Sequence, residues 1–135
     1  MRIFRNKSFT RFAKKAALDD SALLKAIDDA ERGLIDARLG GGVIKQRVAR
    51  LGQGKSGGFR AIILYKAHEL AFFVHGFAKS DRDNIGSDEL AALKLLASQM
   101  LSYDNQSIAK AVESGTLIEV TRHEKILFTS AGLTP

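Results

Sequence analysis

The hydrophobic pattern of this chain changes its period at the run Gly40-Gly41-Gly42. Before this run, apolar residues recur every three or four positions, which is the spacing of one face of an α-helix. Directly after it, over residues 43–51, they alternate with polar residues, which is the spacing of a half-buried β-strand. Three consecutive glycines are not expected inside a regular element, so they indicate a turn or hinge. The chain therefore combines helices, which come first, with a sheet that follows.

Two antiparallel helices are predicted before the glycines. The first covers residues 8–18, with Ser8 as its possible N-cap, and the second opens at residues 19–21 and is stopped by Gly33. Each has a single apolar face, so we expect both helices to cover the same face of the sheet. The residues of these two faces are Phe9, Phe12, Ala13 and Ala16 in the first helix, and Leu23, Leu24, Ile27 and Ala30 in the second, with Leu34 one turn on.

Residues 43–51 alternate like a strand, and residues 59–66 and 69–77 are runs rich in β-forming residues, so three strands are predicted. The second and third are joined by the short link Ala67-His68, which predicts a hairpin, and the three together predict an antiparallel meander. A helical turn is expected at residues 80–85, followed by a strong helix from Ser87, a short one around Ile108 and a last strand at 117–120. The predicted fold is thus α+β: an antiparallel meander with two N-terminal helices on one face and one or two C-terminal helices, in a single domain over residues 1–135.

Charge is concentrated in the middle of the chain. Residues 43–82 carry eight Lys or Arg against two acidic residues, a net charge of +6, whereas residues 1–42 carry +3 and residues 83–135 carry −3. A basic patch on a weakly charged scaffold is typical of proteins that bind a polyanion, usually nucleic acid. Scattered solubility charges are the alternative interpretation.

The absence of cysteine excludes disulfides and thiolate metal sites. No apolar run approaches the length of a membrane span or of a signal peptide. We therefore expect a soluble cytoplasmic protein with no membrane partner.

Residues 49–56 satisfy the relaxed phosphate-loop pattern, in which Ala replaces the first glycine of G-x-x-x-x-G-K-[ST]. A phosphate loop needs a helix directly after it, whose N-terminus faces the phosphates. Here Ser56 is followed by two glycines and then by a predicted strand, so we reject a nucleotide triphosphatase. The glycines either let the backbone approach a phosphate or form a wide hairpin loop.

Three segments of the sequence resemble one branch of the RelE/HigB-like toxins of type II toxin–antitoxin systems. The resemblance covers roughly residues 8–120, and it implies a RelE-like fold of the microbial ribonuclease type. The segments that carry it are Asp36–Lys45, Val48–Ile63, with its Gly-Lys-Ser-Gly-Gly-aromatic-Arg element, and Ala71–Ile85, with the helix from Asp88 that follows.

The resemblance implies a ribosome-dependent messenger RNA endoribonuclease that inhibits translation and arrests growth. Members of this family cut RNA by attack of a 2′-OH on the adjacent phosphate, without metal or other cofactor. The reaction needs a base, an acid and positive charge near the phosphate. The implied partners are messenger RNA, the ribosome and a cognate antitoxin, often a small helix-turn-helix protein, through which alone the toxin contacts operator DNA.

Carried over to this sequence, the resemblance makes Arg60 the phosphate-binding arginine and Lys45 and Arg47 a basic strand pair, with Lys79 and Arg82 in a basic segment after the third strand. Ser80 and Gly86 stand where the family has an arginine and a catalytic tyrosine, so the base and acid are left open among His75, Tyr65 and Lys45. The predicted catalytic residues are therefore Arg60, Lys45, Lys79 and His75, and the predicted RNA-binding residues are Arg47, Arg50, Lys55 and Arg82, with no metal ligand.

Other interpretations stay open. Arg60 could instead form a structural ion pair with Asp81 or Asp83, and His75 could be a core histidine. The chain could also be a ParE-like toxin that inhibits DNA gyrase without nuclease activity, or an inactive member that only binds its antitoxin.

Overall fold

The computed structural model describes residues 1–49, 58–80 and 84–122 and arranges their strands in one six-stranded sheet. The four strands of the centre and one edge form an antiparallel meander, which confirms the predicted meander. The first strand of the chain pairs parallel with the end of this meander and antiparallel with the last strand. The order across the sheet is β2 (Ala37–Gly40), β3 (Val43–Val48), β4 (Phe59–Lys66), β5 (Leu70–Ala78), β1 (Arg2–Asn6) and β6 (Leu117–Val120).

Two of these strands, β1 and β2, were not predicted. In β1, the neighbouring residues Ile3 and Phe4 are both buried, because the strand has a hydrophobic core on each face and therefore no apolar–polar alternation. The edge strand β2 has only four residues and ends in a glycine, so it lacks a usable period.

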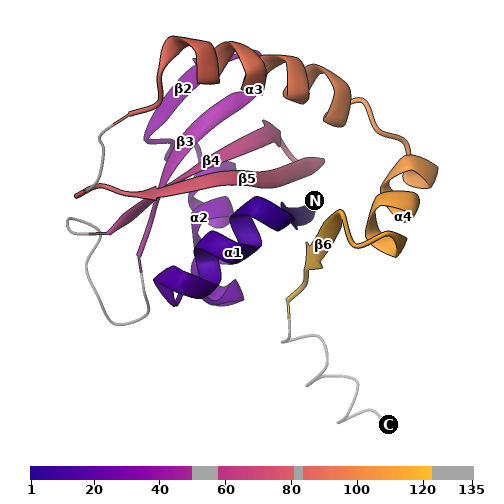
Figure 1. Ribbon diagram of the computed structural model, residues 1–135, viewed down its shortest axis with the longest axis horizontal. Helices are drawn as coiled ribbons and strands as arrows, with labels where there is room; N and C mark the ends of the chain where they lie inside the picture. Colours follow the sequence, from indigo (N-terminus) through magenta and orange to yellow (C-terminus); the bar gives the residue numbers. More distant parts are fainter. Residues whose placement is uncertain (50–57, 81–83, 123–135) are drawn as a thin grey trace, which may run out of the picture.

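Helices α1 (Lys7–Ala16) and α2 (Asp20–Glu31) lie on one face of the sheet, as predicted (Figure 1). The N-cap of α1 is Asn6 and not Ser8, since the Asn6 side chain accepts a hydrogen bond of 2.8 Å from the Phe9 N–H. Asp19 caps α2 in the same way. The core between these helices and the sheet includes Phe9, Leu23, Ile27, Ile44, Ile63 and Phe73.

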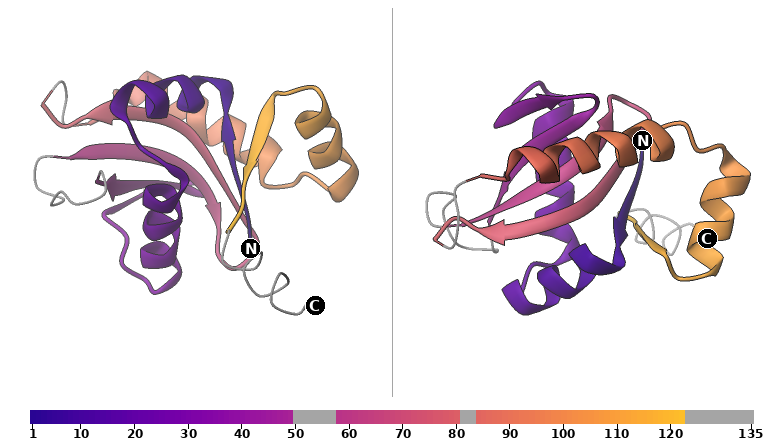
Figure 2. Two further views of the ribbon diagram at one scale, coloured as in Figure 1. Left: turned by 90° about the horizontal axis from the view of Figure 1, so that it is seen from below. Right: turned by 45° about the horizontal axis from the view of Figure 1, so that its top comes forward.

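The opposite face of the sheet packs against α3 (Ser87–Met100), which confirms the strong helix predicted there. The second C-terminal helix, α4 (Asn105–Glu113), lies next to β6, outside the sheet (Figure 2). The core on this side includes Phe4, Ile62, Leu64, Phe72, Met100 and Ile108. Within the described residues, no helix has both the length and the apolar character needed to cross a membrane.

The glycine run forms the tight turn between β2 and β3, as predicted, and all three of its glycines have positive φ. A Cβ on Gly42 would lie 2.6 Å from a methyl carbon of Leu101. Glycine at this position therefore lets the end of α3 approach the turn.

Candidate active site

Strands β3, β4 and β5 bring four of the predicted site residues onto the face of the sheet where α3 lies. Arg47 is paired directly with Arg60, and Lys45 is paired with Ile62, which belongs to the core under α3. Ile62 is in turn paired with His75. Paired residues project to the same face of a sheet, and residues two positions apart on a strand lie about 7 Å apart. Two adjacent rows result, Lys45–Ile62–His75 and Arg47–Arg60–Phe77.

A β-bulge in β5 accounts for the orientation of His75. Ile62 pairs with His75, but the next residue of β4 pairs with Phe73, so Val74 is an extra residue in β5. In an unbroken strand, His75 would share the face of Phe73 and point toward α1. The extra residue reverses the alternation beyond it, which is a common effect of a bulge. The His75 ring therefore lies on the α3 side, with its centroid 6.0 Å from that of Phe77 and its Nε2 atom buried.

Arg60 is the buried cation of this face, with only 5% of its surface exposed. Its Nε atom lies 3.6 Å from Oδ2 of Asp36, and its Nη1 donates a hydrogen bond of 3.3 Å to the Phe59 carbonyl. Arg47 donates from Nε to Oδ1 of the same carboxylate at 3.1 Å, and 51% of its side chain is exposed. One carboxylate thus contacts both arginines of the second row.

Among the described residues, Arg60 forms an ion pair with Asp36. The two carboxylates considered from the sequence, Asp81 and Asp83, lie outside the described residues. At 3.6 Å the contact with Asp36 is too long for a hydrogen bond. Arg60 consequently keeps hydrogen-bonding capacity that a second anion can use.

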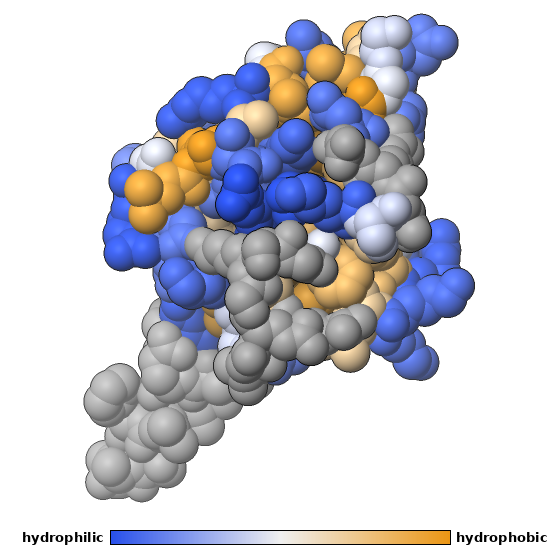
Figure 3. All heavy atoms as spheres, turned by 90° about the vertical axis from the view of Figure 1, so that its left-hand side faces the viewer, coloured by the Kyte–Doolittle hydropathy of each residue, from blue (hydrophilic) through white to orange (hydrophobic). Residues whose placement is uncertain are grey.

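The remaining predicted cations are less closely associated with the rows. Lys79 lies one residue beyond the end of β5 in an exposed turn, where its N–H donates to the Gly58 carbonyl at 3.4 Å. Arg50, Lys55 and Arg82 lie outside the described residues, as does nearly all of the phosphate-loop-like segment. Figure 3 shows the left-hand side of the molecule in Figure 1. On this side, hydrophilic residues form a band between hydrophobic areas above and below.

A family model described as the RelE toxin of the RelE / RelB toxin–antitoxin system matches residues 1–120. This chain belongs to the RelE toxin family. A comparison with curated proteins found no match. The matched range includes every helix and strand described above, so the assignment applies to the whole fold that carries the two rows.

In this RelE-family chain, Tyr65 lies on the other face of the sheet and is not brought to the two rows. Its hydroxyl donates to Oε2 of Glu31, and burial together with this hydrogen bond raises the pKa of Tyr65. His68 contacts the same carboxylate through its N–H, at 3.1 Å, and through Nδ1, also at 3.1 Å. These contacts link the β4–β5 hairpin to the end of α2.

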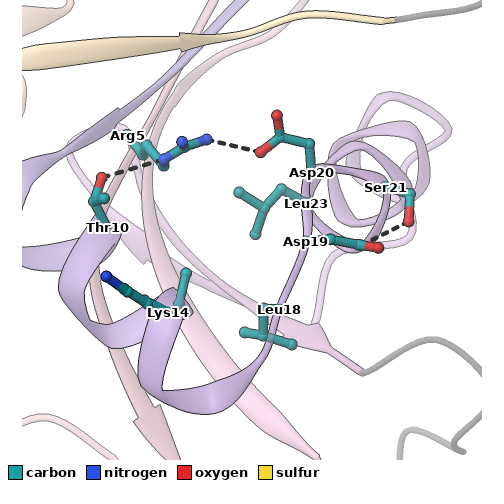
Figure 4. Close-up of a pocket in the computed structure, with 9 residues that line it drawn as sticks. Arg5, Thr10, Lys14, Leu18, Asp19, Asp20, Ser21 and Leu23 are labelled. Atoms are coloured by element: carbon teal, nitrogen blue, oxygen red, sulfur yellow. Dashed lines mark hydrogen bonds and ion pairs between the residues drawn. The ribbon is translucent and has the colours of Figure 1, made fainter.

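A cavity of about 610 Å³ lies between α1 and α2, on the side of the sheet opposite the rows (Figure 4). Leu18 and Leu23 line it, and Arg5 reaches Asp20 at 2.7 Å across its mouth. The predicted site residues do not line this cavity. Over the same described residues, no cluster of three or more His, Asp or Glu side chains could hold a metal ion.

Two residues next to the rows were not selected from the sequence, Asp36 and Gln46. Gln46 is 3% exposed, and its Oε1 accepts a hydrogen bond of 2.9 Å from the Asp36 N–H. A signal for Gln46 did exist, because it occupies an inward position between Ile44 and Val48, where an apolar residue is the rule. No comparable pattern distinguishes Asp36, since its contacts depend on how β2 meets β3.

Proposed function

We propose that this chain is a HigB-like toxin that cuts messenger RNA on the ribosome, and so inhibits translation and arrests growth. The observation that carries the proposal is the shared face of Lys45, Arg47, Arg60 and His75. Three cations within two adjacent rows give the concentrated positive charge that a phosphodiester needs. Family membership supports the toxin assignment.

In the proposed reaction, a 2′-oxygen attacks the adjacent phosphorus and the bond from phosphorus to the 5′-oxygen breaks. The products are a 2′,3′-cyclic phosphate and a free 5′-OH. Arg60 and Arg47 bind the phosphate oxygens through charge-assisted hydrogen bonds, and Lys45 stabilises the charge that develops on the pentavalent phosphorane. Because fixed side chains supply this charge, the proposal includes no metal ion or other cofactor.

Proton transfer is assigned to His75, whose imidazole is suited to both roles near neutral pH. As a base it takes the proton of the 2′-OH, and as an acid it returns a proton to the 5′-oxygen. Lys79, at the end of β5, is proposed to bind the RNA backbone next to the scissile phosphate, together with Arg50, Lys55 and Arg82.

The proposed partners are messenger RNA, the ribosome and a cognate antitoxin of the RelB type or a small helix-turn-helix protein. The antitoxin neutralises the toxin, and operator DNA is contacted only through the antitoxin. The net charge of +6 agrees with polyanionic partners.

The proposal is tested by expressing the wild type and a Lys45→Ala/Arg60→Ala variant in bacteria and mapping the 5′ ends of cellular messages by primer extension. New 5′ ends are expected with the wild type and none with the variant. Arg38→Ala/Lys66→Ala is the matched control, because it removes the same charges at exposed positions outside the two rows, and it is expected to cut like the wild type.

Two other results would contradict the proposal. Growth arrest with intact messages and an SOS response would point to gyrase inhibition. Neither cleavage nor arrest, from a folded protein that still binds its antitoxin, would point to an inactive family member.

A further inference from the structure

Asp36 lies between α2 and β2, at the start of the edge strand, and its carboxylate contacts both arginines of the second row. Oδ1 accepts from Arg47 Nε at 3.1 Å, and Oδ2 lies 3.6 Å from Arg60 Nε. Only 18% of the Asp36 side chain is exposed. Arg60 is 5% exposed, so its contact with Asp36 lies largely out of water, where charge–charge interactions are screened less. The contact with Arg47, whose side chain is 51% exposed, is open to solvent.

A buried amide holds the backbone of Asp36 in place. Gln46 accepts from the Asp36 N–H, and its Nε2 donates to the carbonyls of Ala26 at 3.0 Å and Leu34 at 2.9 Å. Gln46 projects to the α2 side of β3 and its neighbour Arg47 to the α3 side. One strand thus fixes both the main chain and the carboxylate of Asp36.

This arrangement explains how two arginines can occupy a directly paired position. Like charges opposite each other on neighbouring strands repel and destabilise the pairing. The Asp36 carboxylate lies against both guanidinium groups and offsets that repulsion. Both contacts use Nε, and within the described part of the chain neither terminal nitrogen of Arg47 donates a hydrogen bond. The terminal nitrogens are the ones that bind a phosphate as a fork.

We infer that Asp36 is a positioning residue, which holds Arg47 by a hydrogen bond to Nε and Arg60 by an ion pair at Nε, so that the terminal nitrogens of Arg47 and Nη2 of Arg60 meet the scissile phosphate. The inference rests on the proposed nuclease function. A positioning role also predicts a combination of changes in RNA affinity and turnover that a merely structural role does not. Removing the carboxylate leaves the site with one more positive charge, so RNA binds at least as tightly, while turnover falls because the guanidinium groups are no longer aligned.

The test uses the full chain, a messenger RNA programmed on ribosomes for turnover, and an oligonucleotide with a 2′-deoxy cleavage site for binding. For Asp36→Asn we expect turnover to fall by about 10- to 100-fold, with RNA affinity equal to or above that of the wild type. Asp36→Glu, which keeps the charge, is expected to restore part of the turnover. Asp28→Asn is the matched control, because Asp28 pairs with Arg122 on the surface, and it should change neither quantity.

The inference is overturned if Asp36→Asn turns over like the wild type, or if its turnover falls only in proportion to RNA affinity or folded fraction. A second readout does not depend on cleavage: the ¹⁵N-detected Nε–H signal of Arg47, the group that hydrogen-bonds to Asp36. We expect slow solvent exchange in the wild type and fast exchange in Asp36→Asn. Unchanged exchange would refute the positioning role even if RNA is cut. A wild type that cuts no RNA but shows the exchange difference would refute the proposed nuclease instead.

Discussion

Burying the guanidinium of Arg60 removes water from a charged group. This desolvation is strongly unfavourable for a cation that has no anion beside it. Asp36 compensates for part of this cost, and in the proposed reaction the phosphate is a second anion beside Arg60. The sequence predicted a cation here and allowed an ion pair. It could not identify the partner, because Asp36 reaches Arg60 across β3 only once the strands have paired.

His75 provides the most direct residue-scale test of the proposed proton transfer. Replacing it with Ala should lower the cleavage rate by about 100- to 10,000-fold, which is the usual contribution of a general acid or base. His68→Ala is the control, since His68 lies at the tip of the β4–β5 hairpin. Single-turnover cleavage is the measurement, and equal rates for the two variants would remove His75 from the reaction.

Glu31 gives the protein a pH-dependent contribution to stability. Burial raises the pKa of Glu31, but the hydrogen bonds from Tyr65 and His68 outweigh it, so the net pKa lies below the ordinary value of 4.5. The stabilisation is therefore fully present above about the ordinary value and is lost as pH falls through the lower folded-state pKa.

We accordingly expect Glu31→Gln to reduce the free energy of unfolding by about 1–3 kcal/mol near neutral pH. This difference from the wild type should shrink as pH falls below 4.5, the ordinary pKa of the group. Urea unfolding at a series of pH values measures it. A difference that stays constant down to the acid range would show that Glu31 does not stabilise the fold through its charge.

At the scale of elements, the bulge in β5 decides which side chains face α3. The β-rich composition of residues 69–77 predicted a strand, and β5 confirms it, but an extra residue inside a strand leaves no mark in the hydrophobic pattern. For the same reason the sequence could not establish the side of His75. Strand β1 was not predicted. It is buried on both faces, so its apolar and polar residues do not alternate.

Gly76, the residue after His75, shows how tightly the bulged strand is packed. A Cβ at this position would lie 2.3 Å from Cδ2 of Phe12 in α1. Gly76→Ala should therefore destabilise the protein by about 1–3 kcal/mol. In a Phe12→Ala background the same substitution should cost much less, because the ring that it meets is gone. A double-mutant cycle by chemical denaturation measures the coupling, and additive effects would contradict this packing.

At the scale of the whole molecule, two hydrophobic cores enclose the sheet, and Lys45, Arg47 and Arg60 lie on the face of the sheet that packs against α3. The order of the two N-terminal helices and the meander follows from the change of period at the glycine run, which is why the fold class could be predicted. For the candidate site, the sequence predicted which basic residues and which histidine lie on the three strands, but not which of them are neighbours in space. Which of them meet depends on register, and the positions of Arg50, Lys55 and Arg82 stay predictions.

The central claim is that these cations promote attack by a 2′-OH on the neighbouring phosphate. The most direct measurement compares two messenger RNAs, programmed on ribosomes, that are identical except for one 2′-deoxynucleotide on the 5′ side of the mapped cleavage position. We expect cleavage of the all-ribose message, with a 2′,3′-cyclic phosphate on the upstream fragment, and no cleavage at that position in the deoxy message. Equal cutting of both messages would contradict the central claim.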